Sequence, residues 1–463
     1  MLGNMMNGQL QISGLIEHAE KYHSDVEIVS RSVEGPIHRY TYTDAAKRSR
    51  KLANALTKLG LKKGDTVGTL AWNTFRHFEL YFGVSGIGCV VNTVNPRLFP
   101  EQLTYIINHA ENQYLFIDLT FVELVESLQG ELKGVKGFVI LTDRENMPDT
   151  KLANTICYEE LISDESEDFQ WPEFDENTAS SLCYTSGTTG NPKGVLYSHR
   201  STILHAWIVS SGNVAKVSSS SCILPVVPMF HVNAWGIPYA GAMFGAKLVF
   251  PGPSLDGASI YELIDNEKPD LLMGVPTVWL GLLQHLRETN QTLDCVETAL
   301  VGGSAAPRAM IQEFEEEHDV FLMHGWGMTE MSPLGTATSR TKEMDTLDLE
   351  KRYDLQQKQG KAFFGVDMTI ADDDGNELPH DGIAFGRLLV KGPTIVERYY
   401  KAIHLPPQPM KQMWRDLMHT LLLFQCLESL HLLNERNAYA SAIRLPDLND
   451  LQFPLLQFED FFH

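Results

Sequence analysis

Apolar residues recur with two different periods along most of the chain, and the two periods alternate. Over residues 43–59, the apolar side chains from Ala45 to Leu59 fall on one helical face, with Asp44 in the first turn and Gly60 just after the end. This pattern predicts a capped amphipathic helix. The apolar run 66–70 predicts a buried strand, and residues 75–86 predict another helix. The run 236–250 contains Lys247 and several glycines, so we expect a buried helix or a pair of strands there.

The same alternation continues to about residue 335 and indicates parallel sheets covered by helices. We expect further strands at 115–117, 137–141, 181–185, 247–250, 271–273 and 297–301, and further helices at 200–209, 259–266, 277–286 and 308–316. The polar and acidic stretch 164–176, which contains Pro172, is the best candidate for a junction between subdomains.

After Thr336 the pattern changes to short strands. Residues 367–370 and 387–390 are expected to be strands, with the turn signal Asp374-Gly375-Asn376 between them, which predicts a small β subdomain. Beyond His404 a proline-rich break precedes residues 413–433, which favour one amphipathic helix. The predicted organisation is a first α/β subdomain at 1–175, a second at 176–335, a small β subdomain at 336–400, and a tail at 401–463 that is partly helical or disordered.

Charge and cysteine usage narrow the classes of function. The 463 residues include 37 basic and 59 acidic side chains, a net charge of −22. So acidic a surface repels the nucleic-acid backbone and anionic lipids, so we expect no nucleic-acid partner, although a local basic patch could still hold a phosphate. The six cysteines show no CxxC spacing, which is typical of free thiols in a reducing cytosol.

Neither a signal-peptide pattern nor an apolar run long enough to span a bilayer is present, so a cytoplasmic protein is expected.

Residues 184–195 carry the most informative pattern, Tyr-Thr-Ser-Gly-Thr-Thr-Gly-Asn-Pro-Lys-Gly-Val, directly after a predicted strand. Glycines let backbone N–H groups approach a phosphate, hydroxyls add donors, and Lys193 adds a mobile positive charge. The segment therefore predicts a polyphosphate site, to which Mg²⁺ could bind. It is not a Walker A loop, because Lys193 follows Pro192 and precedes Gly194. The alternative is a flexible loop without a ligand.

Three later segments complete an ordered set: Pro-Met-Phe-His-Val-Asn-Ala-Trp-Gly at 228–236, Gly-Gly-Ser-Ala-Ala-Pro at 302–307, and His-Gly-Trp-Gly-Met-Thr-Glu at 324–330. Together with 184–195 they resemble the motifs of the adenylate-forming superfamily, which includes acyl-CoA synthetases, luciferases and peptide-synthetase adenylation domains. The resemblance covers about residues 10–400. Residues 95–98, 197–200 and 226–235 are similar to the medium- and long-chain fatty acyl-CoA synthetase group. The implied fold has two helix-covered, mostly parallel sheets and a small β-barrel-like subdomain.

The resemblance also implies a reaction and a set of site residues. A fatty acid would be activated with ATP to an acyl-adenylate and then transferred to coenzyme A. The implied catalytic residues are Thr185, Lys193, His231 and Glu330, with Thr185 and Glu330 near Mg²⁺. The implied nucleotide-binding residues are Thr185, Ser186, Gly187, Thr188, Thr189, Gly190, Lys193, Gly302, Gly303, Ser304, His324, Gly325, Trp326, Gly327 and Thr329. The implied acyl-site residues are His231, Val232 and Trp235.

Each of these assignments has a plainer alternative. Glu330 could be a solvated surface acid, His231 a packing residue, Trp235 a core aromatic, and the glycines could serve tight turns alone. If residues 231–235 are helical, His231 and Trp235 share one face, and the resemblance implies that Trp235 gates the acyl tunnel.

The tail departs from the family pattern. The family carries a C-terminal lid of roughly 100 residues after a Thr-Gly-Asp motif, whereas residues 401–463 contain neither that motif nor any glycine, and Lys411 is the only lysine after Lys401. We therefore expect an impaired ligase. The alternatives are a non-catalytic pseudoenzyme that binds ATP or acyl chains, a partner in a homodimer, and an aryl or luciferase-like ligase.

Overall fold

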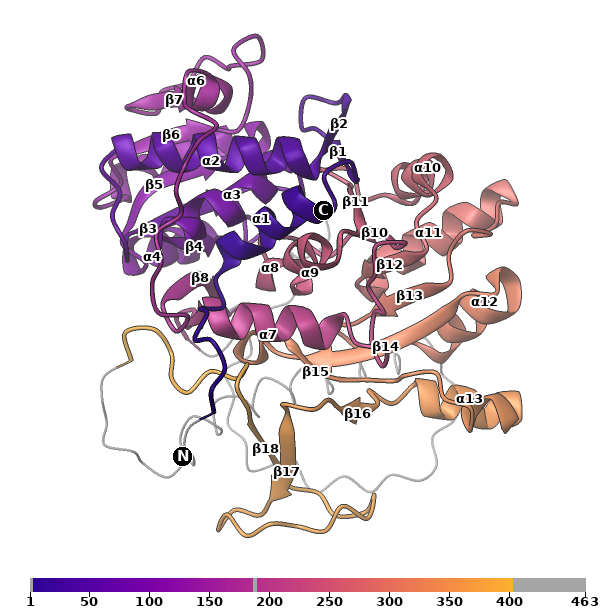
Figure 1. The fold of residues 1–463 in the computed structure, drawn as a ribbon. Helices are drawn as coiled ribbons and strands as arrows, with labels where there is room; N and C mark the ends of the chain where they lie inside the picture. Colours follow the sequence, from indigo (N-terminus) through magenta and orange to yellow (C-terminus); the bar gives the residue numbers. More distant parts are fainter. Residues whose placement is uncertain (1–2, 186–189, 403–463) are drawn as a thin grey trace, which may run out of the picture. The chain divides into compact units, whose positions relative to one another are not determined.

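Two large β-sheets, each mostly parallel and covered by helices, make up most of the chain (Figure 1). The computed structural model describes residues 3–185 and 190–402. The predicted α/β class with two mostly parallel sheets is confirmed. Ser186, Gly187, Thr188 and Thr189 lie outside the described residues, and so do the predicted tail from residue 403 and its helix at 413–433.

The first sheet has seven strands in the order β7-β6-β5-β3-β4-β8-β9 and is parallel except for the β8–β9 pair. Every residue of β3, β4 and β6 is buried, as expected for strands with both sheet faces covered. Its strands are β3 (Thr66–Leu70), β4 (Val90–Thr93), β5 (Asn112–Ile117), β6 (Gly137–Ile140), β7 (Thr155–Cys157), β8 (Ala179–Tyr184) and β9 (Gly194–Ser198).

The second sheet has nine strands in the order β16-β15-β14-β13-β12-β10-β11-β1-β2. The six strands from β14 to β1 run parallel, and the two ends of the sheet are antiparallel. Its strands are β1 (Glu27–Arg31), β2 (Ile37–Thr41), β10 (Cys222–Pro225), β11 (Lys247–Phe250), β12 (Leu271–Gly274), β13 (Thr298–Val301), β14 (Phe321–Gly327), β15 (Leu334–Ala337) and β16 (Lys361–Ala362).

The helices fill the space between the sheets and cover their outer faces. They are α1 (Ile12–Tyr22), α2 (Tyr42–Lys58), α3 (Phe75–Gly86), α4 (Pro100–His109), α5 (Val122–Leu128), α6 (Tyr158–Ser163), α7 (His199–Val209), α8 (Val232–Trp235), α9 (Ile237–Phe244), α10 (Gly257–Glu267), α11 (Pro276–Thr289), α12 (Arg308–His318) and α13 (Leu349–Gln356). Short 3-10 turns are η1 (Leu119–Phe121), η2 (Gln129–Glu131), η3 (Thr329–Met331) and η4 (Met344–Thr346).

Three apolar cores give the body five layers. The central core joins α1, α2, α3, α7 and α9 to the facing sides of both sheets. A second core lies under α10, α11 and α12 on the outer face of the second sheet, and a third lies under α4 and α5 on the outer face of the first. In the part of the chain that the structure describes, no helix combines the length and apolarity needed to cross a membrane.

Several predicted elements match the predicted bounds to within one residue. Helix α2 begins with a capping box in which the Thr41 hydroxyl accepts from the Asp44 N–H and the Asp44 carboxylate accepts from the Thr41 N–H. Strand β3 and helix α3 match the predicted ranges 66–70 and 75–86. The run 236–250 forms helix α9 followed by strand β11, and thus combines one element of each expected kind.

The third predicted part contains a two-stranded antiparallel sheet of β17 (Asp367–Ala371) and β18 (Arg387–Lys391). The large sheets draw strands from both sides of residue 175, since β8 and β9 complete the first sheet and β1 and β2 complete the second. The subdomain ranges 1–175, 176–335 and 336–400 therefore stay a prediction.

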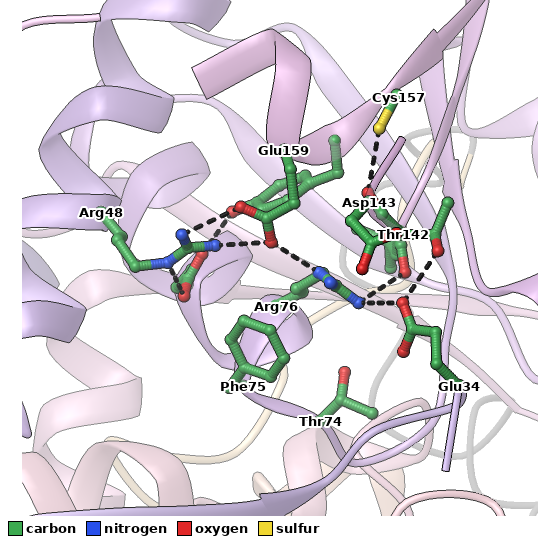
Figure 2. A network of polar contacts seen from close by, with 12 residues as sticks. Glu34, Arg48, Thr74, Phe75, Arg76, Thr142, Asp143, Cys157 and Glu159 are labelled. Carbon is green, nitrogen blue, oxygen red and sulfur yellow. Dashed lines mark hydrogen bonds and ion pairs between the residues drawn. The ribbon is translucent and has the colours of Figure 1, made fainter. Parts of the chain in front are cut away.

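A buried cluster of charges ties the two sheets together (Figure 2). Arg76 of α3 lies between Glu34, on the turn after β1, and Glu159 of α6, at 2.7 and 2.8 Å. The Arg48 guanidinium meets the Glu159 carboxylate with two bonds of 3.0 Å, and its Nε donates to Glu79. Because the Arg76 side chain is only 8% exposed, these ion pairs are shielded from solvent.

Candidate active site

The first motif closes a hairpin at the carboxyl end of β8. Tyr184 pairs with Gly194 in the β8–β9 ladder, so Thr185 and Lys193 lie side by side just beyond the last strand pair. The Thr185 N–H donates to the Lys193 carbonyl at 3.0 Å, and the Thr185 hydroxyl accepts from the Lys193 N–H at 3.2 Å. Within the loop, Gly190 is exposed and adopts φ +149°. The base of the predicted phosphate loop is therefore fixed by the two residues predicted to act there.

The second motif adopts a backbone that the sequence does not predict. His231 is extended, and Val232–Trp235 then turns with φ between +47° and +55°, which is the left-handed helical sense. A left-handed turn of non-glycine residues costs about 1–2 kcal/mol per residue. The condition for His231 and Trp235 to share one face of a right-handed helix is therefore not met. Strain of this kind persists only where the surroundings impose it, and it concentrates at functional sites.

Two buried amides hold this turn in place. Asn73, which precedes α3, donates to the carbonyls of Pro225 and Val227 at 2.8 Å each, and its side-chain oxygen accepts from the Met229 N–H at 2.6 Å. Inside the turn, the Asn233 amide donates to the Ser181 hydroxyl at 2.9 Å. These bonds attach the segment before His231 to the start of α3, and the turn after it to β8.

Gly302 lies where the second, third and fourth motifs come together. A Cβ added to Gly302 would lie 3.1 Å from the Trp235 ring and 3.2 Å from the Gly325 carbonyl oxygen. The indole therefore lies directly against the Gly302 backbone, and a larger residue there would have to push its neighbours by a few tenths of an ångström. Trp235 also packs against the central core, so its role as a core aromatic and its predicted role at the acyl site are compatible.

The rest of the third and fourth motifs lies on the same carboxyl-end edge of the second sheet. Gly303 is exposed, with φ +85°. His324 of β14 is buried and donates from Nδ1 to the Gln357 carbonyl at 3.0 Å, and the Ser304 backbone interacts with the same imidazole. Burial lowers the pKa of His324. Trp326 and Gly327 follow on β14 and pair with β15.

Thr329 and Glu330 lie in η3, the turn between β14 and β15. The Glu330 side chain is 7% exposed, so it is not a solvated surface acid. Its carboxylate accepts a hydrogen bond of 2.6 Å from the Tyr399 hydroxyl. Among the residues that the structure describes, no cationic side chain forms an ion pair with it. A buried carboxylate without a cation is costly, and this one would be stabilised by a bound metal ion.

Lys193 and Glu330 both contact the side chain of Tyr399. The Lys193 Nζ is 5.3 Å from the centre of the Tyr399 ring. His231, at the start of the left-handed turn, is exposed. The first and fourth motifs therefore meet at Tyr399, and the second and fourth motifs both approach the third at Gly302. This convergence of four distant segments gives the candidate active site.

The model of the family described as "AMP-binding enzyme" matches residues 15–400. The chain belongs to this family. Among curated relatives, it is 49% identical over 401 residues to a 3-methylmercaptopropionyl-CoA ligase of Ruegeria lacuscaerulensis, covering 87% of this chain and 74% of the relative. It is 46% identical over 400 residues to a medium-chain-fatty-acid–CoA ligase of Ectopseudomonas oleovorans, covering 86% and 73%. It is 42% identical over 396 residues to a long-chain-fatty-acid–CoA ligase of Thermus thermophilus, covering 86% and 71%.

Solved structures share the fold of this AMP-binding enzyme. The anthranilate CoA ligase AuaEII in complex with anthranoyl-AMP superposes with a TM-score of 0.74 at 21% identity, covering 85% of this chain and 71% of that one. A long-chain-fatty-acid–CoA ligase from Archaeoglobus fulgidus gives a TM-score of 0.73 at 21% identity, covering 87% and 79%.

AMP-binding CoA ligases use ATP, Mg²⁺ and coenzyme A. The residues present fit a magnesium–nucleotide complex, because the buried Glu330 carboxylate lacks a cationic partner in the described part of the chain. Its oxygen and the Thr185 hydroxyl are also ligands of the hard type that Mg²⁺ prefers. The sequence did not point to three supporting residues, Asn73, Tyr399 and His205. The last of these accepts a hydrogen bond from the Leu334 N–H at 3.3 Å. None of these three falls within the quoted motifs.

Proposed function

We propose that this acyl-CoA ligase family member activates a medium- or long-chain fatty acid with ATP. A carboxylate oxygen of the acid attacks the α-phosphorus, the bond to the β-phosphate oxygen breaks, and pyrophosphate leaves the acyl-adenylate. In the second step the thiol of coenzyme A attacks the acyl carbonyl and AMP leaves. The relatives named for medium- and long-chain fatty acids support this substrate class at 46% and 42% identity.

The buried Glu330 next to the Lys193 loop carries the proposal. In this mechanism Thr185 and Lys193 would bind the β- and γ-phosphates, and Glu330 and Thr185 would hold Mg²⁺. The cation, when bound, neutralises phosphate charge. The exposed backbone at Gly303 and the Gly325–Gly327 strand line the nucleotide. In this mechanism His231, at the start of the strained turn, contacts the acyl carboxylate beside the nucleotide. Catalysis by such a site is mainly positioning and charge stabilisation.

Trp235 is the proposed boundary of the acyl site, together with Val232. The indole lies against Gly302, so movement of its ring would open or close space beside the third motif. Val232 is buried and packs with Tyr197 and Cys183. This packing holds the first residue of the left-handed turn against the strands β8 and β9.

One relative favours a second substrate. The 49% identical protein is named for 3-methylmercaptopropionate, a short thioether acid. Its acid would occupy the same site between His231 and Trp235 but would fill much less apolar space than a fatty acyl chain.

Pyrophosphate release by the purified 463-residue chain tests the proposal. The panel contains 3-methylmercaptopropionate and straight-chain acids from propionate to palmitate, each with ATP and Mg²⁺. Release that depends on a medium- or long-chain acid supports the first substrate class, and release confined to the thioether acid supports the second. ATP binding without release with any acid would contradict activation and support the non-catalytic alternative.

Acyl-CoA formation is measured in parallel. We propose that it is slower than acyl-adenylate formation, since residues 401–463 contain no Thr-Gly-Asp motif and only one lysine after Lys401. Thioester formation that keeps pace with pyrophosphate release would contradict this impairment.

A further inference from the structure

Tyr399 contacts both charged side chains of the candidate site. Its hydroxyl donates to Glu330 Oε1 at 2.6 Å, and its ring lies 5.3 Å from the Lys193 ammonium. The two charged residues are 137 positions apart in the sequence and come from different sheets, since Lys193 precedes β9 and Glu330 lies in η3. One aromatic side chain therefore lies between the predicted metal ligand and the predicted phosphate-binding lysine.

The backbone around Tyr399 is attached to both motifs. We call residues 394–401 the crossing strap. Near its start, the Val396 N–H donates to the Glu330 carbonyl at 2.8 Å, and the Ser332 hydroxyl donates to the Thr394 carbonyl at 2.7 Å. After Tyr399, the Tyr400 N–H donates to the Gly194 carbonyl at 2.8 Å. The strap is thus hydrogen-bonded to η3 on one side of Tyr399 and to β9 on the other.

The far end of the strap is also anchored. The Lys401 ammonium donates to the His109 carbonyl at 2.9 Å and pairs with Glu111 at 2.7 Å. Tyr399 itself packs with Val195, Tyr197 and Val232 in a small apolar cluster. A side chain held by its backbone on both sides and by its ring has little freedom, so it can fix the groups that it contacts.

We propose that Tyr399 is a positioning residue with two separable functions, and the inference rests on the proposed function. The hydroxyl orients the Glu330 carboxylate for Mg²⁺, in the way that outer hydrogen bonds orient metal ligands in proteins. The ring holds the Lys193 ammonium for the nucleotide phosphates through a cation–π contact.

Two variants separate these functions. Tyr399→Phe removes the hydroxyl and keeps the ring, whereas Tyr399→Leu removes both. The readout is thermal stabilisation of the full chain by ATP as Mg²⁺ is titrated, which requires no turnover. We expect Tyr399→Phe to raise the half-saturating Mg²⁺ concentration about tenfold. At saturating Mg²⁺ its affinity for ATP should match that of the wild type.

Tyr399→Leu should show the same loss in Mg²⁺ and, in addition, a roughly threefold loss of ATP affinity at saturating Mg²⁺. The matched control is Tyr400→Phe, which removes a hydroxyl from the neighbouring residue and leaves its backbone bond to Gly194 and its ring contact with His109. This control should leave both values within twofold of the wild type.

A double-variant cycle distinguishes orientation of Glu330 from a general loss of structure. In a Glu330→Gln background, Tyr399→Phe should cause no further change in the Mg²⁺ requirement, since the group it orients is gone. An unchanged Mg²⁺ midpoint in Tyr399→Phe would overturn the inference, and so would an equal further loss in the Glu330→Gln background. If ATP fails to stabilise even the wild type, the proposed function fails and the inference falls with it.

Discussion

The Trp235 ring lies against the backbone of Gly302, so that the second and third motifs touch with little room for a side chain between them. An added methyl group at Gly302 would come 3.1 Å from the indole and 3.2 Å from the Gly325 carbonyl oxygen. Both distances are shorter than an ordinary carbon contact, and the carbonyl belongs to a β-strand that cannot easily move.

Gly302→Ala should therefore displace Trp235 and weaken binding of a non-hydrolysable acyl-adenylate analogue by about tenfold, because small displacements in such sites have large effects. The measurement is the concentration of analogue that gives half of the maximal thermal stabilisation. Gly281→Ala is the matched control, because a methyl group there meets no atom closer than 4.0 Å and lies within helix α11. Analogue binding that is equally affected in both variants would show that the Trp235 contact is unimportant.

A local sequence pattern contains the bounds of a helix or strand but not the sheet that the strand joins. Strand β3 and helix α3 are predicted from short, largely apolar runs of the length typical of each element, and their bounds follow directly from the chain. The sheet to which a strand belongs is set by distant packing. Thus β1 and β2 complete the second sheet although they precede every strand of the first. No local signal at residues 27–41 reports this pairing.

In the candidate active site, too, the sequence identifies the motif residues but not the residues that support them. The motifs place Lys193, His231 and Glu330 in their segments, but nothing in the sequence marks Asn73 or Tyr399 as their supports. The left-handed turn at 232–235 contradicts local preference, since valine and tryptophan disfavour positive φ. It forms because buried hydrogen bonds such as that from Asn233 to Ser181 compensate for the strain.

Asn73 offers a sharp test of that support. Its amide N–H groups donate to two carbonyls, and its oxygen accepts from the Met229 N–H. Asn73→Asp keeps the shape and the acceptor but directs a carboxylate oxygen at the Pro225 and Val227 carbonyls. We expect a loss of about 3 kcal/mol or more in the free energy of unfolding at pH 7, because two buried bonds become repulsive.

This loss should depend on pH in a defined direction. The new carboxyl would have a folded pKa above its unfolded value near 3.9. The folded protein then binds more protons, so the penalty shrinks as the pH falls from the folded pKa toward the unfolded one. Urea unfolding of Asn73→Asp and wild type at pH 7 and pH 5 measures it. A penalty that is the same at both pH values and below 1 kcal/mol would argue against the clamp.

His205 predicts a second pH dependence, with the opposite sign. It is 1% exposed, and desolvation lowers its pKa from 6.5 to about 3. Its Nε2 accepts from the Leu334 N–H, which requires the neutral ring. Because the unfolded state binds more protons, His205 lowers stability as the pH falls from about 6.5 toward 3, by up to about 1.4 kcal/mol per pH unit.

His205→Gln removes the titrating group and keeps an acceptor. We expect its stability, measured by urea unfolding between pH 7 and pH 4.5, to fall less steeply with acid than that of the wild type. His380→Gln, at an exposed site, should retain the wild-type slope. Identical slopes in all three proteins would mean that His205 is not held neutral in the folded state.

The charge cluster of Figure 2 should stabilise the contact between the two sheets through Arg76. This side chain is 8% exposed and bonds to Glu34, Glu159 and the Leu141 carbonyl. Removing one partner of a buried pair leaves an uncompensated charge, so Arg76→Ala should cost about 3–5 kcal/mol in the free energy of unfolding. Arg144→Ala breaks an ion pair with Glu160 that is exposed on both sides, and it should cost less than about 1 kcal/mol.

A second substitution identifies which charge carries the penalty. Glu159 retains two bonds from Arg48 when Arg76 is removed, whereas Glu34 retains only the 2.8 Å bond from the Thr142 hydroxyl among the described residues. The uncompensated charge is therefore that of Glu34. Glu34→Gln should recover part of the stability lost in Arg76→Ala, yet destabilise the wild type, where it removes a paired charge. Equal destabilisation by Glu34→Gln in both backgrounds, measured by urea unfolding, would show that the two residues do not act as a pair.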